Sequence, residues 1–396
     1  MDLDEARSEI RNVDEAMRAL FLRRMEAVRH VAAYKAERGL PIEDKVQETR
    51  VVSALAPEVP DAELRSYYVR FLQDVMDVSK RWQHHLTEGV RVAYSGVEGA
   101  FAHIAATRIF PDATAVSFAS FEDAYNAVAE GDCDLAVLPF ENSYAGEVGA
   151  VLDLMFSGNL YVNGVYDLSV TQNILGVPGA TLADVQEVVS HPQALTQCET
   201  YIRAHGLVTH AAANTAVAAM RVARTGNKAL AAIASAETAR LYGLEVLDHD
   251  INESRANTTR FAVFSRVESR PVAKGEKAAF LLLFTVKDET GGLAKAVNAI
   301  SSYGFNMNIL RSRPMKDLPW HYFFYVEAEG DDTGDDGRRM LTALRAACPT
   351  VKVVGRYVAD RVLREDPPEE KHAGDGASAS GSVQASAAAN EGEADE

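Results

Sequence analysis

The spacing of apolar residues changes along the chain, and each change marks a different kind of packing. Residues 1–88 repeat apolar residues at helical spacing, with breaks at Gly39 and at three prolines. Residues 90–267 instead alternate short apolar runs with alanine-rich helical windows, which is typical of α/β layers. A chain of 396 residues also exceeds what one hydrophobic core usually supports. The sequence therefore predicts several domains.

A third unit follows a polar linker, ESRPVAKGEK. Residues 277–360 show strand and helix patterns in the order βαββαβ, which predicts a ferredoxin-like α+β domain. Residues 365–396 are rich in Ala, Ser, Gly and Glu and lack apolar periodicity, so we expect a disordered acidic tail there. This tail holds one basic and nine acidic residues, and so accounts for much of the acidity of the chain.

The overall charge and the cysteines restrict the class of protein. The chain has 40 basic and 57 acidic residues, a net charge of −17, which excludes a general basic surface for nucleic acid or anionic membrane. No apolar run is long enough for a transmembrane helix, and the charged N-terminus does not fit a signal peptide. The isolated residues Cys133, Cys198 and Cys348 favour a reducing compartment. We expect a cytoplasmic protein with no nucleic-acid or membrane partner.

The first helical segment places three cations in phase with an apolar stripe. The stripe, which we expect to be buried, consists of Ile10, Val13, Met17, Leu20, Val28 and Val31. Arg7, Arg24 and Lys35 fall in register with it. A buried cation is costly unless it is paired, and the acids of this helix lie mostly off the stripe. One interpretation is an anionic ligand, and the alternative is a helical bundle whose cations reach solvent or acids on other helices.

The polar positions of residues 1–88 resemble those of the all-helical (AroQ-type) chorismate mutase domain. The resemblance rests on ARSEIRNVDEAMRALFLRRMEAVRHVAAYK, PIEDKVQE and SKRWQ. It implies a homodimer or higher homo-oligomer, because Arg7 would reach into the site of a partner subunit. Gln47 stands where the family often has arginine. The implied site comprises catalytic Lys35 and Gln83 at the ether oxygen, and substrate-binding Arg7, Arg24, Asp44, Glu48 and Ser79.

The chemistry of a chorismate mutase suits such a set of side chains. A Claisen rearrangement is pericyclic and needs neither a nucleophile nor a proton transfer. The enzyme has to hold a compact conformer of chorismate and stabilise the negative charge that grows on the breaking ether oxygen. Cations and amides in a fixed arrangement achieve both, so no cofactor is expected.

The central region clusters small polar residues at the ends of apolar runs, where open α/β sheets place ligands. The clusters are PFENSYAGEV (139–148), SHPQALTQC (190–198), AAIASAETARLYGL (231–244) and NTTRF (257–261). In this order they resemble prephenate dehydratase. The resemblance implies two α/β lobes similar to a periplasmic binding protein, with the active site in the cleft. The second lobe would span residues 168–247 approximately.

The resemblance to prephenate dehydratase also implies roles for individual residues. The enzyme must protonate or orient the departing hydroxyl of prephenate while carbon dioxide leaves, and Thr259 is the catalytic candidate. Strand alternation places Arg260 on the opposite face, so we interpret it as structural. For His191, a turn-capping role before Pro192 is favoured over catalysis. The expected substrate-binding residues are Asn142, Ser143, Gln193 and Thr215.

This central region departs from the family pattern at three positions. Ala100 and Ala102 replace residues that often carry hydroxyls, and Gln172 stands where the family often has histidine. With few cations in this region, we expect backbone amides and hydroxyls to bind the substrate carboxylates. Arogenate, which carries an amino group, is an alternative substrate.

The third unit resembles the ACT regulatory domain of these dehydratases, through a glycine turn before its first helix and an SRP sequence after its second strand. The resemblance implies that L-phenylalanine binds there as an effector, between paired ACT domains. Arg311 replaces the usual glutamate of that motif. A purely structural dimerisation module is the alternative. The expected effector-binding residues are Gly291, Gly292, Leu293, Ser312, Arg313 and Pro314.

The three resemblances together predict a bifunctional chorismate mutase/prephenate dehydratase. Such an enzyme converts chorismate to prephenate and then to phenylpyruvate in phenylalanine biosynthesis, without metal or organic cofactor. One alternative is an enzyme in which only one centre is active. Another is an amino-acid sensor without catalysis, although a sensor would not need Thr259.

Overall fold

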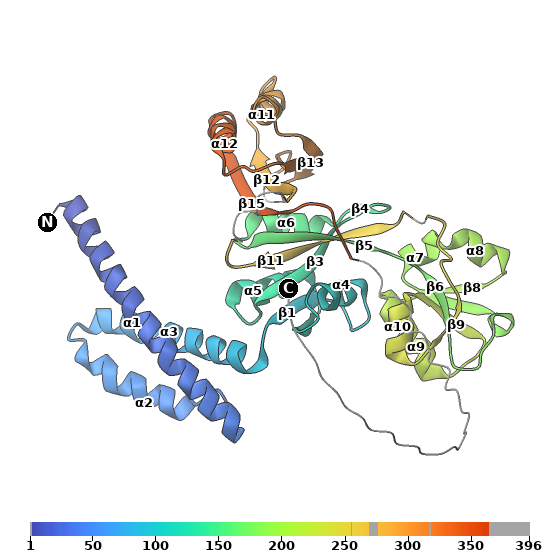
Figure 1. Ribbon diagram of the computed structural model, residues 1–396, viewed down its shortest axis with the longest axis horizontal. Coiled ribbons are helices and arrows are strands. Elements are labelled where there is room, and N and C mark those ends of the chain that lie inside the picture. Colours follow the sequence, from blue (N-terminus) through green and yellow to red (C-terminus); the bar gives the residue numbers. More distant parts are fainter. Residues whose placement is uncertain (1, 255, 269–275, 317, 364–396) are drawn as a thin grey trace, which may run out of the picture. The chain divides into compact units, whose positions relative to one another are not determined.

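The computed structural model describes residues 2–254, 256–268, 276–316 and 318–363 (Figure 1). The tail predicted for residues 365–396 lies outside the described residues. None of the helices in the described ranges is long and apolar enough to cross a membrane. Within the same ranges, no cluster of three or more His, Cys, Asp or Glu side chains is arranged to hold a metal ion.

The N-terminal region is entirely helical. Asp2 and Glu5 form a capping box that starts the first helix, and Gly39 ends it in the left-handed conformation, with φ of 62°. Asp44 and Asp61 cap the next two α-helices with their side chains. The elements are α1 (Leu3–Arg38), α2 (Lys45–Leu55), the short 3-10 helix η1 (Ala56–Glu58) and α3 (Ala62–Glu88).

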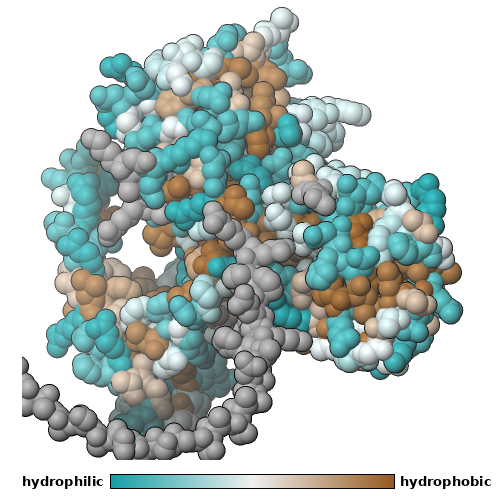
Figure 2. Space-filling model, turned by 45° about the vertical axis from the view of Figure 1, so that its right-hand side comes forward, coloured by the Kyte–Doolittle hydropathy of each residue, from teal (hydrophilic) through white to brown (hydrophobic). Residues whose placement is uncertain are grey.

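The apolar stripe of α1 is largely exposed in the single chain. Within α1 only Val28 and Ala32 are buried, whereas Ile10 is 60% and Leu20 61% exposed. The prediction of a buried stripe is therefore wrong for one chain, because α2 and α3 cover only part of α1. Figure 2 shows that hydrophobic residues, in brown, are visible among hydrophilic ones on the surface of the molecule.

The central region contains two sheets, as expected of two α/β lobes. The strands of the first sheet are β1 (Arg91–Ser95), β2 (Thr114–Phe118), β3 (Leu135–Asn142), β4 (Gly146–Glu147), β5 (Tyr161–Ser169) and β11 (Thr258–Ser265). Its helices are α4 (Phe101–Ile109), α5 (Phe121–Glu130) and α6 (Gly149–Ser157). The chain then builds the second lobe and returns, so that β11 enters the first sheet between β3 and β5 and runs antiparallel to both.

The second lobe is built on five strands in the order β10-β6-β9-β7-β8. Apolar side chains bury both faces of this sheet, with Leu175 and Val189 on one and Ile174 and Val188 on the other. The strands are β6 (Asn173–Gly176), β7 (Glu187–Ser190), β8 (Val208–Ala211), β9 (Leu230–Ala234) and β10 (Glu245–Asp248). The helices are η2 (Leu182–Asp184), α7 (Pro192–Gln197), α8 (Glu199–Ala204), α9 (Thr215–Thr225) and α10 (Ala236–Tyr242).

The C-terminal unit follows the predicted βαββαβ order. Its antiparallel strands lie in the order β13-β14-β12-β15, and both helices pack on the face that buries Phe280, Leu282 and Phe284. The elements are β12 (Ala278–Thr285), α11 (Gly292–Ser301), β13 (Met307–Pro314), β14 (Tyr322–Glu329), α12 (Asp335–Ala347), β15 (Thr350–Val358) and β16 (Arg361–Leu363).

The C-terminal sheet continues the first sheet of the central region through strand β5. Strand β15 meets β5 at one residue pair, Gly355 with Val162, and β16 then pairs with β5 over Tyr166–Leu168. A Cβ atom on Gly355 would lie 2.0 Å from the Val162 carbonyl oxygen, so this approach requires glycine. The face of the C-terminal sheet that its own helices leave free shares one apolar cluster with the first sheet. Phe140 and Leu283 are both buried in this cluster.

Candidate active sites

A cavity of about 480 Å³ is lined by residues of both lobes of the central region. Strands β3 and β11 contribute Asn142 and Thr259 from the first lobe, and helices α7 and α9 contribute Gln193 and Thr215 from the second. Four of the five residues expected at the dehydratase centre therefore line one cavity. The register of the sheet explains the first pair, because Thr259 and Asn142 are direct cross-strand neighbours.

Hydrogen bonds fix the side chains of Asn142 and Thr259. Asn142 is 9% exposed, and its Oδ1 accepts bonds from the backbone N–H groups of Tyr144 and Ala145 at 3.0 and 2.8 Å. Its Nδ2 donates to Thr259 Oγ1 at 2.9 Å and to Asn257 Oδ1 at 2.9 Å. Because Thr259 Oγ1 accepts this bond, its own proton remains available to donate to a ligand in the cavity.

The cavity holds no Lys or Arg among the described residues that line it. Instead, two helices begin at its wall: Ala100 and Ala102 belong to the start of α4, and Thr215 is the first residue of α9. Unpaired backbone N–H groups and the helix dipole make such ends suitable for anions. This agrees with the expectation that amides, rather than cationic side chains, bind carboxylates here.

Two of the polar residues in the sequence motifs serve local structure. The Ser143 side chain does not line the cavity; its hydroxyl donates to the Ala256 carbonyl at 2.8 Å and accepts from the Thr258 N–H at 2.9 Å. The substrate-binding prediction for Ser143 is therefore not supported, because its hydroxyl joins two loops. His191 is the N-cap of α7, and its Nδ1 accepts from the Gln193 N–H at 3.2 Å. The capping interpretation of His191 agrees with this geometry.

Several polar residues that line the cavity were not among the predicted site residues, including Glu147, Gln172 and Gln197. Gln172 and Gln197 are 2% and 6% exposed, and Gln172 Oε1 is buried without a hydrogen-bond partner. The signals were a glutamine in place of the family histidine at 172 and the second glutamine of SHPQALTQC at 197.

The two lobes also contact each other beside the cavity. Thr238 Oγ1 donates to the Gly99 carbonyl at 2.8 Å, and the Tyr242 hydroxyl donates to the Glu98 carbonyl at 2.8 Å. The Gly99 N–H in turn donates to His103 Nδ1 at 3.1 Å. Burial lowers the pKa of His103, which keeps its imidazole neutral and able to accept this bond.

In the helical region, the polar atoms that are buried without hydrogen-bond partners include Arg24 Nη1 on α1 and Gln83 Oε1 on α3. Burial lowers the pKa of Arg24. Ser79 is buried, and its hydroxyl donates to the Val75 carbonyl at 2.8 Å. Lys35 Nζ donates to the Ile42 carbonyl at 2.6 Å. An unpaired buried guanidinium nitrogen and an unpaired amide oxygen are costly, and a polar ligand would satisfy them.

The other predicted mutase residues lie at more exposed positions. Asp44 Oδ1 accepts from the Gln47 N–H at 2.9 Å and so caps α2. Glu48 forms an ion pair with Lys80 at 3.2 Å, a cation that the sequence analysis did not single out. The side chain of Arg7 is 62% exposed and lies 3.8 Å from Asp4. Within one chain, Arg7 therefore reaches no buried site.

The predicted effector residues separate into two groups. Gly291, Gly292 and Leu293 line a cavity of about 560 Å³ in the C-terminal unit. Arg313 instead contacts the central region, with Nε 2.5 Å from Asp153 Oδ1 and Nη1 3.2 Å from Glu147 Oε1. Neither Ser312 nor Pro314 lines this cavity. The grouping of all six residues in one site is therefore not supported within a single chain.

Comparisons with known proteins agree with this architecture. Residues 92–269 match the prephenate dehydratase family, and residues 6–84 match the chorismate mutase type II family. Over 285 residues the chain is 33% identical to arogenate dehydratase/prephenate dehydratase 2, chloroplastic, of Arabidopsis thaliana, covering 69% of this chain and 74% of the relative. Over 378 residues it is 28% identical to the bifunctional chorismate mutase/prephenate dehydratase of Escherichia coli (strain K12), covering 91% and 97%.

A solved structure shows the same fold over about two thirds of the chain. The prephenate dehydratase of Arthrobacter aurescens, in complex with L-Phe, superposes with a TM-score of 0.63 at 28% identity, covering 68% of this chain and 90% of that chain. The helical region and the two-lobed cleft together define an isomerase joined to a carbon–oxygen lyase. The chain belongs to the prephenate dehydratase family, in its bifunctional group with a chorismate mutase domain. It therefore carries both enzyme activities, the rearrangement of chorismate and the dehydration of prephenate.

Proposed function

We propose that the dehydration of prephenate takes place in the interlobe cavity and that Thr259 assists departure of the ring hydroxyl. The bond from Asn142 Nδ2 to Thr259 Oγ1 carries this proposal, because it turns the threonine hydroxyl into a donor toward the cavity. A threonine hydroxyl is a weak acid. It therefore acts by hydrogen bonding to the leaving oxygen as carbon dioxide departs and the ring becomes aromatic.

The substrate carboxylates are bound by the starts of α4 and α9, which belong to different lobes. Neutral donors at these helix ends stabilise a carboxylate without the strong desolvation cost of a lysine or arginine. Gln193 and Thr215 supply side-chain hydrogen bonds beside them. The boundaries of this dehydratase domain are residues 90–267, with a second lobe from about 168 to 247.

The mutase domain, residues 1–88, works as a homodimer. Arg24 and Gln83 carry the unpaired buried atoms that chorismate would satisfy, and Lys35 lies on the same helix as Arg24. Arg7 and the apolar stripe of α1 are exposed among the described residues of one chain. A second copy of α1 would bury that stripe and bring Arg7 to the neighbouring site, as the resemblance implies.

The C-terminal unit, residues 277–360, is an ACT domain that binds L-phenylalanine and regulates the dehydratase. The L-Phe complex of the Arthrobacter aurescens relative supports this assignment. The cavity beside Gly291 and Gly292 is the binding site in this chain. A Cβ on Gly292 would lie 2.4 Å from the Lys287 carbonyl oxygen, so the turn that forms this wall requires glycine. Trp320 and Tyr322 also line the cavity and suit an aromatic ligand.

Arogenate is a second candidate substrate of the same cavity. Glu147 is a carboxylate in the lining, and Gln172 Oε1 lacks a partner, so both atoms would accept hydrogen bonds from an ammonium group. Glu147 is shared with Arg313 at 3.2 Å, which weakens its attraction for a cation. We therefore propose prephenate as the preferred substrate and arogenate as the second candidate. The ratio of kcat/KM for the two substrates decides between them.

A two-substrate assay tests the proposal. The purified full chain is supplied with chorismate and, separately, with prephenate, and prephenate and phenylpyruvate are measured in each reaction. We expect prephenate to appear first from chorismate and phenylpyruvate to appear from either substrate. Added phenylalanine should lower the rate from prephenate. Failure to form phenylpyruvate from supplied prephenate would contradict the dehydratase assignment, whereas indifference to saturating phenylalanine would contradict only the regulatory one.

A further inference from the structure

Arg260 follows Thr259 on β11 but points to the other face of the sheet. In the register of the sheet Arg260 lies directly opposite Glu141 on β3 and Asp167 on β5, as Thr259 lies opposite Asn142. Neighbouring residues of a strand point to opposite faces, so the Thr259 pair faces the cavity and the Arg260 set faces away from it. A movement of the β11 backbone at Arg260 therefore moves Thr259 as well.

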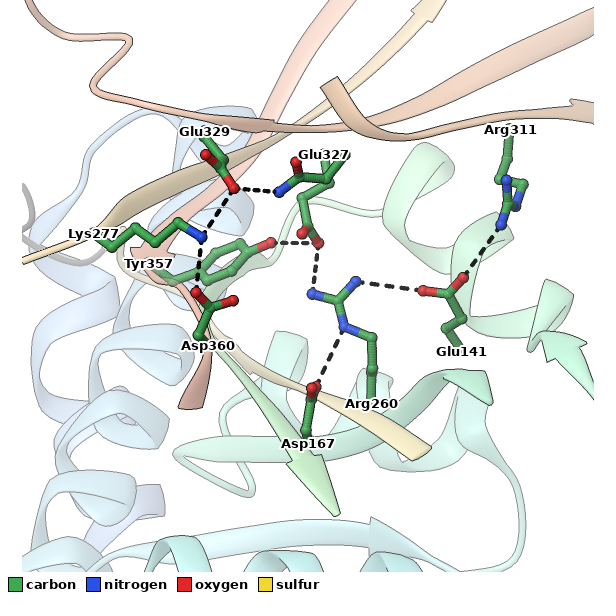
Figure 3. A network of polar contacts seen from close by, with 10 residues as sticks. Glu141, Asp167, Arg260, Lys277, Arg311, Glu327, Glu329, Tyr357 and Asp360 are labelled. Atoms are coloured by element: carbon green, nitrogen blue, oxygen red, sulfur yellow. Dashed lines mark hydrogen bonds and ion pairs between the residues drawn. The ribbon is translucent and has the colours of Figure 1, made fainter. Parts of the chain in front are cut away.

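Three carboxylates surround the Arg260 guanidinium, and one of them belongs to the C-terminal unit (Figure 3). Nη1 lies 3.4 Å from Glu141 Oε2, and Nε lies 3.4 Å from Asp167 Oδ1. The shortest contact is from Nη2 to Glu327 Oε2 at 2.7 Å. The side chains of Arg260 and Glu327 are 19% and 7% exposed, so this pair is shielded from solvent and from salt.

Glu327 is itself held in place by the C-terminal unit. It lies on β14, and the Tyr357 hydroxyl of β15 donates to its Oε2 at 2.8 Å. Burial alone would lower the pKa of Arg260, but the negative charge of Glu327 keeps that pKa above its ordinary value. Arg260 therefore stays charged.

This ion pair has a particular position among the contacts of the C-terminal unit. Two other cations of that unit contact α6: Arg313 pairs with Asp153, and Lys352 donates to the Met155 carbonyl oxygen. Arg311 lies 3.7 Å from Glu141 on β3. Among the residues that the structure describes, Glu327 forms the ion pair from this unit that ends on β11. Glu327 thus contacts β11, the strand of Thr259, on the face opposite to the cavity.

We propose that Arg260 is a positioning residue for dehydration, and that the ion pair with Glu327 fixes the position of its guanidinium. The C-terminal unit thereby fixes Thr259 relative to the leaving hydroxyl, and a ligand-induced shift of β14 alters turnover through the same pair. This inference rests on the proposed role of Thr259. It assigns the arginine of the TRF sequence to coupling between the two regions, since its guanidinium points away from the substrate cavity.

Glu327→Gln in the full chain is the direct test. The substitution keeps the size of the side chain, removes its charge, and leaves Arg260 with Glu141 and Asp167, so no cation is left unpaired in the interior. We expect kcat for prephenate to fall roughly tenfold, in the range usual for coupled sites, while KM stays within about twofold. Glu327→Asp should restore part of kcat. The mutase rate of the same chain should not change.

Asp332→Asn is the matched control. Asp332 is 2% exposed and pairs with Arg356 Nε at 2.6 Å, so this variant also breaks a buried ion pair on the C-terminal unit, but one that does not involve Arg260. It should lower thermal stability without the selective fall in kcat. The proposal is overturned by wild-type kcat in Glu327→Gln, or by an equal fall in both variants. Retained dehydration in a chain that lacks the Thr259 hydroxyl would instead overturn the proposed function.

Discussion

Replacement of Thr259 by valine separates a chemical role of its hydroxyl from a structural one. Valine has nearly the same shape but cannot accept the bond that Asn142 Nδ2 makes to Thr259 Oγ1 at 2.9 Å. After the change, Asn142 Nδ2 still has Asn257 Oδ1 at 2.9 Å and the Thr258 carbonyl oxygen at 3.3 Å. No donor is left unsatisfied, so the loss of stability should be that of one hydrogen bond, about 1 kcal/mol.

The expected loss of activity is much larger than this loss of stability. Removal of one positioned hydrogen-bond donor usually lowers kcat roughly 100- to 1,000-fold, and Thr259→Val should lower kcat for prephenate by an amount in that range. Thr259→Ser keeps the hydroxyl and should retain at least about a tenth of the wild-type kcat. The difference between the two variants therefore measures the hydroxyl rather than the fold of the strand.

The assay uses the full chain, so that each preparation carries its own control. Phenylpyruvate formation from prephenate reports on the dehydratase, and prephenate formation from chorismate reports on the mutase in the same sample. Equal mutase rates in wild type and variant show that the comparison uses equal amounts of folded enzyme. A Thr259→Val enzyme that keeps more than about a tenth of the dehydratase kcat would refute the role that we give to the hydroxyl.

Three further outcomes follow from other parts of the structure. Arg24→Met should abolish mutase turnover at little cost in stability, because Arg24 Nη1 has no partner to lose; retained mutase activity would remove Arg24 from the site. Burial lowers the pKa of His103, so its contribution to stability is complete above about pH 6.5 and is lost as the pH falls toward the folded-state pKa. Urea unfolding at several pH values should show this loss, and an unchanged pH profile in His103→Gln would contradict it. Gly355→Ala should lower the unfolding temperature by forcing β15 from β5, whereas Gly334→Ala, whose new Cβ would lie 3.7 Å from its nearest neighbour, should not. Equal unfolding temperatures in the two alanine variants would count against the close approach at Gly355.

Local signals in the sequence predicted many elements well. Gly39 ends α1 in the left-handed conformation, and the alternation of the NTTRF segment places Thr259 and Arg260 on opposite faces of β11. These features depend on residues near each other in the chain. Periodicity and turn chemistry are sufficient for them because the backbone geometry is local.

These local signals could not predict contacts between residues that are far apart in the sequence. Ser143 appeared as a binding residue, although its hydroxyl joins the loop around Thr258. Arg313 was assigned to the effector site but contacts Asp153 on α6. In both cases the choice depends on which polar partner the tertiary fold brings within reach. The stripe on α1 shows a related limit, because periodicity identifies an apolar face but not the element that covers it.

Strand β5 has a consequence for any attempt to separate the domains. One edge of β5 pairs with β11, and among the described residues the other edge is covered by β16 over Tyr166–Leu168 and by the contact of Gly355 with Val162. A dehydratase fragment cut at residue 268 would leave that second edge bare. An uncovered strand with buried side chains such as Val162, Val165 and Leu168 is a template for pairing between molecules. We therefore expect the C-terminal segment to limit aggregation of the enzyme by covering this edge.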